Sequence, residues 1–184
     1  MLGSHNSFSY LKPEKWWMRI FNPWAKCQSK TLEEQYEAGV RVFDIRVRWK
    51  DDKFFLVHNL MTYRDDPFTI IHDLDKFDDI KVRVCLDMRK EPPTKELEEK
   101  ILNEFKKSVK KFQLGVIDCI IFWNWKHLES SPEYTWIDKY GSVAKGLWKY
   151  LPPKVWAWFY NDNVRFNHLK EIKGKGSIVL MDFV

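Results

Sequence analysis

Apolar and polar residues alternate over several short stretches of the chain, a pattern that predicts β-strands. The clearest stretch is 40–49 (VRVFDIRVRW), where β-branched residues alternate with charged ones. The apolar run 54–58 (FFLVH) follows the turn-like sequence 51–53 (DDK), so the two stretches are expected to form a hairpin. Further strands are predicted at 82–88 (VRVCLDM), 117–123 (IDCIIFW), 155–160 (VWAWFY) and 178–183 (IVLMDF).

One long helix is predicted over 95–112, and Thr94 can cap its first turn. Its many Lys and Glu residues are typical of a solvated helix face with pairing between residues four apart. Strands that alternate with helical patterns favour an α/β fold with a mostly parallel sheet, either open or closed into a barrel. The apolar residues of the helix recur at helical spacing: Leu97, Ile101, Phe105 and Val109.

The chain of 184 residues has the length of one ordinary domain, so a single domain over 1–184 is expected. Its three cysteines, Cys27, Cys85 and Cys119, are interpreted as free thiols. An odd number of cysteines at no metal-binding spacing argues against a disulfide scaffold or a zinc finger. The sequence has no run of about 18 apolar residues and no visible signal peptide, so neither a transmembrane helix nor an export signal is expected.

Charge and aromatic content point to an anionic partner. The net charge is +5, the pI is about 9.0 and 16% of the residues are aromatic. This combination is typical of proteins that bind a membrane surface or a nucleic acid. Residues 12–26 (KPEKWWMRIFNPWAK) interleave Trp16, Trp17 and Trp24 with cations, which is typical of an interfacial membrane anchor. The alternative is that these tryptophans pack against the protein itself.

Histidines and charged residues gather at the ends of predicted strands. His5 lies in GSHNS, at the end of a very short N-terminal strand, and His58 closes the run 54–58. Active sites of α/β folds are assembled at the carboxyl ends of strands. Asp44 and Arg46 are two residues apart on one strand, so both side chains point to the same face. Further charges interrupt or end other strands, namely Asp87, Arg89 and Asp182.

These charges have two interpretations. Charged side chains inside buried strands cost several kcal/mol each unless they are paired, so they form either structural salt bridges or a polar active site. Two histidines with an arginine and supporting carboxylates suit one reaction well. A phosphodiester can be cleaved by a neighbouring hydroxyl when one histidine removes its proton and another protonates the leaving oxygen, while a guanidinium neutralises the charge on the phosphate. This set of groups requires no metal.

Five motifs, in the order GSHNS, AGVRVFDIRVRW, FLVHN, VCLDMRKE and IVLMDF, resemble the catalytic X-type domain of phosphatidylinositol-specific phospholipases C. The resemblance is closest to the bacterial, metal-independent branch. It covers about the first 90 residues and the last strand, and no family residues are matched between 92 and 177. The family fold is a distorted TIM barrel. The resemblance therefore favours a small, distorted TIM-type (β/α) barrel with short or missing outer helices, because such barrels usually need about 200 residues or more.

The resemblance also implies roles for five residues. His5 matches the general base that takes the proton from the inositol 2-hydroxyl, whose oxygen attacks phosphorus and gives an inositol cyclic 1,2-phosphate. His58 matches the general acid that protonates the diacylglycerol oxygen. Arg46 matches the arginine that contacts the phosphate. Asp44 matches the carboxylate that orients the catalytic groups, and Asp182 the last-strand aspartate that holds the base histidine.

Residues around the inositol headgroup are implied less directly. Asn6 follows the base histidine where the bacterial branch usually has Asp, and Asn59 follows the acid histidine where Gly is usual. An amide supports a composite general acid less well than a carboxylate does. Asn6 and Arg89 are expected to face the headgroup. Trp123 and Tyr160 either line the headgroup pocket or belong to the aromatic core and rim.

No metal and no cofactor are expected. In the calcium-dependent branch of the family, carboxylates that bind Ca²⁺ stand where this chain has Arg46 and Arg89. Calcium needs several oxygen ligands. Two guanidinium groups repel it and supply its positive charge themselves.

The sequence thus favours a monomeric enzyme that cleaves phosphatidylinositol or a similar anionic phospholipid while bound peripherally to a membrane. Bacterial family members use exposed tryptophans beside the first strand to dock on bilayers. The expected location is cytoplasmic or released from the cell. One alternative is a lipid-headgroup binding module with weak catalysis. Another is RNA binding or cleavage, which is chemically analogous, but no RNA-binding motif supports it and no nucleic-acid partner is expected.

Overall fold

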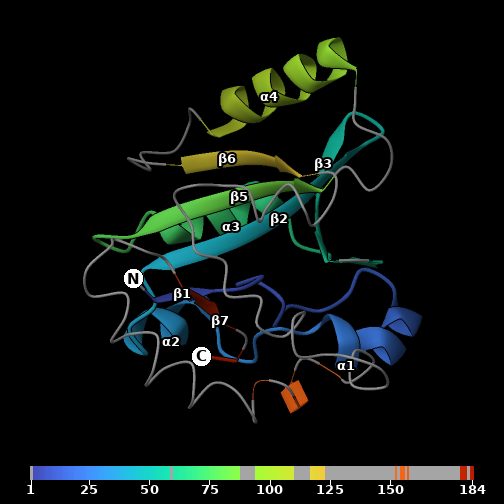
Figure 1. The fold of residues 1–184 in the computed structure, drawn as a ribbon. Coiled ribbons are helices and arrows are strands. Elements are labelled where there is room, and N and C mark those ends of the chain that lie inside the picture. The colour runs from blue at the N-terminus through green and yellow to red at the C-terminus, as the bar shows by residue number, and fades with distance from the viewer. Residues whose placement is uncertain are drawn as a thin grey trace.

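A computed structural model describes residues 2–58, 60–87, 94–109, 117–122 and 179–181, together with 152, 154, 155, 157, 183 and 184 (Figure 1). The strands are β1 (Leu2–Ser4), β2 (Val42–Lys50), β3 (Lys53–His58), β4 (Met61–Thr62), β5 (Lys81–Asp87), β6 (Ile117–Phe122) and β7 (Val179–Met181). The helices are the 3₁₀ helix η1 (Trp16–Phe21), α1 (Asn22–Ala25), α2 (Leu32–Glu37), α3 (Pro67–Leu74) and α4 (Lys95–Val109).

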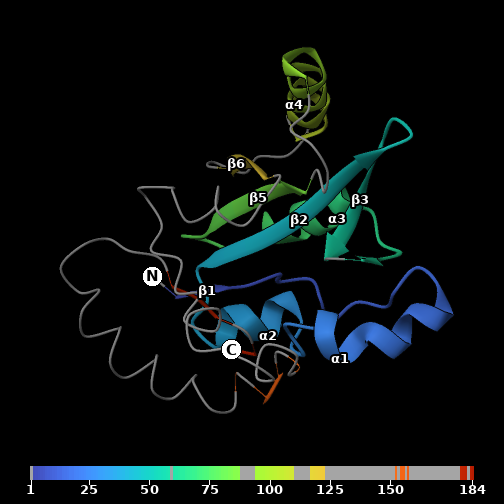
Figure 2. The ribbon, with the colours of Figure 1, turned by 45° about the vertical axis from the view of Figure 1, so that its right-hand side comes forward.

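The sheet has a parallel part and an antiparallel hairpin. Strands β7, β1, β2, β5 and β6 are parallel neighbours in that order. One edge of β2 pairs with β5, and its other edge is shared by two strands. Residues Val42 and Phe43 pair with β1, while Val47–Lys50 pair with β3 in the hairpin. In both ribbon views α2 lies beside β1, and α4 lies beyond β6 at the other end of the sheet (Figure 2).

The predicted strands are present in the described residues with one exception. The hairpin after 40–49 is confirmed, and β5, β6 and β7 lie within or next to the predicted ranges. The strand predicted over 155–160 is wrong where it can be compared, because Val155 and Ala157 are helical. Tyr160 and the rest of that range lie outside the described residues. Closure into a TIM-type barrel stays a prediction, since most of the chain between β6 and β7 is not described.

The short helices, among them α2 and α3, were not predicted from the hydrophobic pattern. α2 has six residues, fewer than two turns, and therefore shows little periodicity. It is stabilised by a capping box in which Thr31 accepts from the Glu34 backbone N–H and the Glu34 carboxylate accepts from that of Thr31. α3 begins at Pro67, a residue favoured in the first turn. α4 begins at Lys95, as predicted, and is described to Val109.

The two faces of β2 and β5 differ in chemistry. Because side chains alternate along a strand, one face of β2 carries Phe43, Ile45 and Val47, which are fully buried in the apolar core with the α3 residues Ile71 and Leu74. The opposite face carries polar side chains that are also buried. The register aligns Asp44 with Arg83 and Arg46 with Cys85 across the strand pair. The sheet thus places a buried polar cluster opposite its apolar core.

Candidate active site

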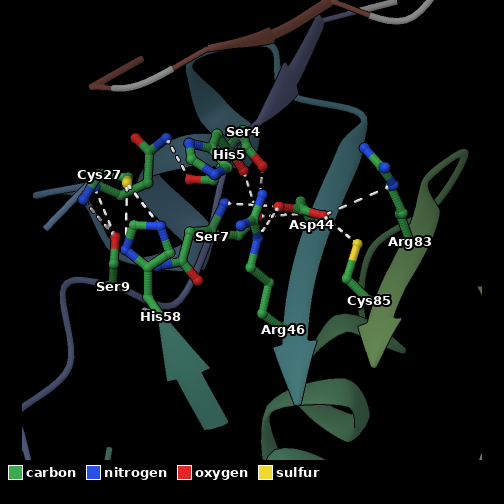
Figure 3. Close-up of polar contacts among 12 residues, drawn as sticks. Ser4, His5, Ser7, Ser9, Cys27, Asp44, Arg46, His58, Arg83 and Cys85 are labelled. Carbon is green, nitrogen blue, oxygen red and sulfur yellow. Dashed lines mark hydrogen bonds and ion pairs between the residues drawn. The ribbon is translucent and has the colours of Figure 1, made fainter. Parts of the chain in front are cut away.

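Two histidines face each other on the polar side of the sheet. His5 directly follows β1, and His58 is the last residue of β3. Their ring centroids are 5.4 Å apart and the ring planes are nearly perpendicular, at 85° (Figure 3). β3 runs antiparallel to β2, so its carboxyl end returns toward β1 and brings His58 to His5. The sequence places these residues far apart, and the hairpin joins them.

The carboxylate of Asp44 organises the cationic part of the site. Its Oδ2 accepts hydrogen bonds from the backbone N–H of Asn6 at 3.1 Å and from Nε of Arg46 at 3.2 Å. Its Oδ1 accepts from the thiol of Cys85 at 3.3 Å and lies 3.9 Å from Nε of Arg83. Burial by itself would raise the pKa of Asp44, but the positive charges of Arg46 and Arg83 outweigh it and hold that pKa well below the usual range.

The turn after β1 is fixed to β2 by the backbone and the hydroxyl of Ser7. Asn6 has a φ of 47°, in the left-handed region that asparagine tolerates better than most residues. The backbone N–H of Ser7 donates to the carbonyl of Asp44 at 2.9 Å, and the backbone N–H of Asp44 donates to the Ser7 hydroxyl at 2.9 Å. These two hydrogen bonds fix the position of His5 relative to Asp44 and Arg46.

His58 has a defined tautomer. Its Nδ1 lies 2.7 Å from the carbonyl oxygen of Ala25. Because a carbonyl only accepts, the proton is on Nδ1 and the lone pair of the neutral ring is on Nε2. Burial, followed by the charges of Arg46 and His5, holds the pKa of His58 well below its ordinary value. The ring is therefore neutral near pH 7 in the free protein.

Cys27 completes the cluster from a third segment. The thiol is buried and its Sγ lies 3.9 Å from Nδ1 and 4.0 Å from Nε2 of His58. The ligand atoms of His5, Cys27 and His58 all lie within 4.8 Å of one another, so these three side chains could hold a metal ion. Within the described residues Cys27 and Cys85 form no disulfide, as expected for both, and the side chain of Cys119 is not described.

Ser9 holds the Cys27 segment in place. Its buried hydroxyl accepts from the backbone N–H groups of Cys27 at 3.0 Å and Gln28 at 2.8 Å. The other side of this segment binds the C-terminus, since the backbone N–H of Phe183 donates to the carbonyl of Cys27 at 2.7 Å. The Gln28 side chain also donates to the carbonyl of His5 at 3.1 Å. The segment therefore links the last residues of the chain to the first histidine.

Replacing Ser9 with alanine is expected to destabilise the fold, because two buried N–H groups lose their acceptor. Each such group costs about 1–3 kcal/mol. Unfolding in urea measures the loss, and Ser29→Ala at an exposed position of the same segment is the matched control. Equal stability of the two variants would contradict the assigned role of Ser9.

The structure brings together five of the residues singled out from the sequence and describes others elsewhere. His5, Asn6, Asp44, Arg46 and His58 share the cluster on the polar face. Trp16, Trp17 and Trp24 are exposed on η1 and α1. Because Ala25 ends α1 and binds His58, this aromatic segment leads directly into the site. Asp87 is the last residue of β5, and the other residues lie outside the described part of the chain, namely Asn59, Arg89, Trp123, Tyr160 and Asp182.

Arg83 and Cys27 were not recognised as site residues from the sequence. Arg83 stands two residues before Cys85 on β5, on the same face, and strand parity could have identified it. Cys27 lies outside regular structure, and no spacing in the sequence connects it to His58.

No protein-family model matches the sequence, and no curated protein matches it. Among solved structures, the fold is similar to that of phosphatidylinositol-specific phospholipase C from Listeria monocytogenes. The sequences are 17% identical, the TM-score is 0.65, and the match covers 100% of this chain and 87% of that one. Two structures of S. aureus phosphatidylinositol-specific phospholipase C match with TM-scores of 0.48 and 0.44 at 20% and 19% identity, covering 67% of this chain and 47% of each of theirs. The chain therefore has a mixed α/β fold like that of the Listeria protein.

Proposed function

We propose that this protein is a phospholipase C-type enzyme that cleaves phosphatidylinositol-like lipids. The observation that carries the proposal is the pair His5 and His58, whose rings face each other at 5.4 Å beside the buried guanidinium of Arg46. Two imidazoles this close together can both reach one phosphodiester, one at the attacking oxygen and the other at the leaving oxygen. The similarity in fold to the Listeria phospholipase supports the same reaction class.

In the proposed reaction, His5 takes the proton from the inositol 2-hydroxyl, and the oxygen attacks phosphorus. The bond from phosphorus to the diacylglycerol oxygen breaks, and His58 delivers a proton to that oxygen. The products are an inositol cyclic 1,2-phosphate and diacylglycerol. Arg46 stabilises the charge on the phosphate oxygens. Asp44 positions Arg46 through their hydrogen bond, and Asp182 is proposed to hold His5.

The role of His58 as an acid requires it to gain a proton when substrate binds. In the free protein, burial and the nearby positive charges keep it neutral. A phosphodiester placed against Arg46 and His58 brings a negative charge, which offsets that of Arg46 and favours the imidazolium. Substrate binding and protonation of His58 are therefore coupled in this proposal.

The headgroup site is proposed to include Asn6, Arg89, Trp123 and Tyr160. Of these, Asn6 is described, and it is fully buried beside Asp44. No cation is proposed to take part, because the guanidinium of Arg46 already supplies positive charge at the phosphate.

The tryptophan-rich segment is proposed to dock the enzyme on anionic membranes. Trp16 is 76% exposed, Ile20 70% and Trp24 51%; Lys15 directly precedes Trp16 in the sequence, and Arg19 directly precedes Ile20. Exposed aromatic residues with adjacent cations are suited to the headgroup region of a bilayer. None of the helices in the described residues is long and apolar enough to cross a membrane.

Replacing both Trp16 and Trp17 with alanine is expected to weaken binding to phosphatidylinositol-containing vesicles by about tenfold or more, because a fully buried aromatic side chain contributes about 1.5–3 kcal/mol. Vesicle sedimentation measures the partitioning. Leu97→Ala removes an exposed apolar side chain from α4 and is the control. Partitioning as strong as that of the control would show that the tryptophans do not dock the protein. Cleavage of a soluble inositol phosphodiester should be unchanged.

The test of the function is release of water-soluble phosphate from phosphatidylinositol in mixed micelles, with phosphatidylcholine as the comparison lipid. The proposal predicts turnover of phosphatidylinositol and little or none of phosphatidylcholine.

A second candidate function is headgroup binding without turnover, which the neutral His58 and the amide of Asn6 favour. It predicts micelle binding with no phosphate released from either lipid.

A further inference from the structure

Three side chains from separate parts of the chain form a cluster whose chemistry goes beyond acid–base catalysis. His5 follows β1, Cys27 follows α1, and His58 ends β3. Their ligand atoms all lie within 4.8 Å of one another, and Figure 3 shows the Cys27 sulfur close to the His58 ring. The proposed reaction uses both imidazoles and has no role for the thiol.

The spacing is close to that of a bound metal ion. Tetrahedral zinc holds sulfur at about 2.3 Å and nitrogen at about 2.1 Å, which places sulfur and nitrogen ligands about 3.6 Å apart. Sγ of Cys27 lies 4.0 Å from Nε2 of His58. The sulfur also lies 3.9 Å from Nδ1 of the same ring, so metal binding requires the Cys27 side chain to rotate toward the lone pair of Nε2.

The surroundings orient two of the ligands. Nδ1–H of His58 donates to the carbonyl of Ala25, which leaves Nε2 as the donor atom for a metal. A backbone carbonyl that fixes the second ring nitrogen is the usual support of a metal-binding histidine. The backbone of Cys27 is held on both sides, by the hydroxyl of Ser9 and by the N–H of Phe183. The ring of His58 and the backbone of Cys27 are therefore held in place before any ion arrives.

We propose that His5, Cys27 and His58 form an inhibitory binding site for a thiophilic divalent ion, with Zn²⁺ as the chemically preferred occupant. One sulfur and two imidazole nitrogens suit Zn²⁺, whereas Ca²⁺ and Mg²⁺ require oxygen ligands. On binding, the thiol of Cys27 loses its proton to solvent and a metal–sulfur bond forms, with no change in oxidation state. The thiolate offsets part of the repulsion between the dication and the nearby Arg46.

The consequence for activity rests on the proposed function, whereas the metal site itself does not. A bound ion occupies a lone pair on each imidazole, so His5 cannot accept a proton from the substrate and His58 cannot carry one to the leaving oxygen. Zn²⁺ should therefore inhibit turnover, and a chelator should restore it. This behaviour is the opposite of that of a metal-dependent phospholipase, which a chelator would inactivate.

Co²⁺ titration of the full-length, chelator-treated protein tests the site independently of activity. Wild type is expected to bind one Co²⁺, to show a thiolate-to-cobalt charge-transfer band with the visible bands of tetrahedral cobalt, and to lose both when Zn²⁺ is added. Cys27→Ser should lose the charge-transfer band and bind about 100-fold more weakly or worse, since even the loss of a supporting partner costs about 10–100-fold. Cys85→Ser is the matched thiol control and should keep the band.

His58→Gln provides a second variant in case Cys27→Ser does not fold, which circular dichroism would show. This variant should retain the charge-transfer band while its visible bands shift, because one nitrogen ligand is lost. His72→Ala, at an exposed position on α3, should leave the whole spectrum unchanged. A wild-type spectrum without the charge-transfer band, or one that persists in Cys27→Ser, would overturn the site. Turnover that is insensitive to Zn²⁺ in a protein that binds Co²⁺ would overturn the inhibitory role alone.

Discussion

Replacing either His5 or His58 with alanine is expected to lower the turnover of phosphatidylinositol by about 10²–10⁴-fold, the usual contribution of a positioned acid or base. The two rings are in edge-to-face contact, with centroids 5.4 Å apart, and both border the place proposed for the phosphodiester. Neither can replace the other, because one transfers a proton at the attacking oxygen and the other at the leaving oxygen. Initial rates on mixed micelles measure the effect, and His72→Ala is the matched control at an exposed position.

The two histidine variants should differ when the leaving group changes. An aryl leaving group departs without protonation, so an aryl ester of inositol 1-phosphate removes the need for a general acid. His58→Ala should recover much of its activity on this substrate, whereas His5→Ala should not, because its defect lies in activation of the 2-hydroxyl. Recovery by His5→Ala alone would reverse the assigned roles. Equal losses on both substrates would show that His58 does not act as the acid.

The second large effect is expected at Asp44. This carboxylate is fully buried between Arg46 and Arg83 and accepts a backbone hydrogen bond from Asn6. Asp44→Asn removes the negative charge that contacts both buried guanidinium groups. Breaking a buried ion pair from one side costs about 3–5 kcal/mol, so the free energy of unfolding should fall by about that amount.

Urea unfolding measures this loss in the free energy of unfolding, and an ion pair on the surface serves as the matched control. Asp52 lies 2.9 Å from Lys100 on the exterior, and Asp52→Asn should change the free energy of unfolding far less, because solvent screens an exposed ion pair. The contribution of Asp44 to the stability of the fold also depends on pH in a definite direction. Because the folded-state pKa of Asp44 is lowered, its contribution is complete well above the unfolded pKa of about 4 and declines as the pH falls below that value. The stability difference between wild type and Asp44→Asn should shrink in the same range. A loss no larger than that of Asp52→Asn would contradict the buried network.

The alternation of side chains between the two faces of a strand accounts for the part of the site that could be predicted from the sequence. The alternation in 40–49 placed Asp44 and Arg46 on one face, and the structure shows them hydrogen-bonded to each other there. The same alternation on β5 places Arg83 on this face, so Arg83 could have been identified in the same way. Cys27 could not be found in this way, because its position depends on contacts with Ser9 and the C-terminus, far from it in sequence.

Local pattern was least informative where elements are short or aromatic. α2 depends on a capping box, a signal that sequence reading could have used at Thr31 and Glu34. The run 155–160 is apolar and aromatic throughout, and such a run fits a strand or a buried helix equally well. Length and flanking prolines favoured a strand, yet Val155 and Ala157 are helical.

Phosphorus NMR of phosphatidylinositol micelles, recorded with a chelator present, tests the central claim most directly. The proposed reaction predicts that the phosphodiester signal is replaced by that of an inositol cyclic 1,2-phosphate, and that His5→Ala and His58→Ala both abolish this change. An acyclic inositol phosphate formed without a cyclic intermediate would contradict attack by the 2-hydroxyl. An unchanged lipid signal in a protein that still binds the micelles would contradict catalysis and leave headgroup binding as the function.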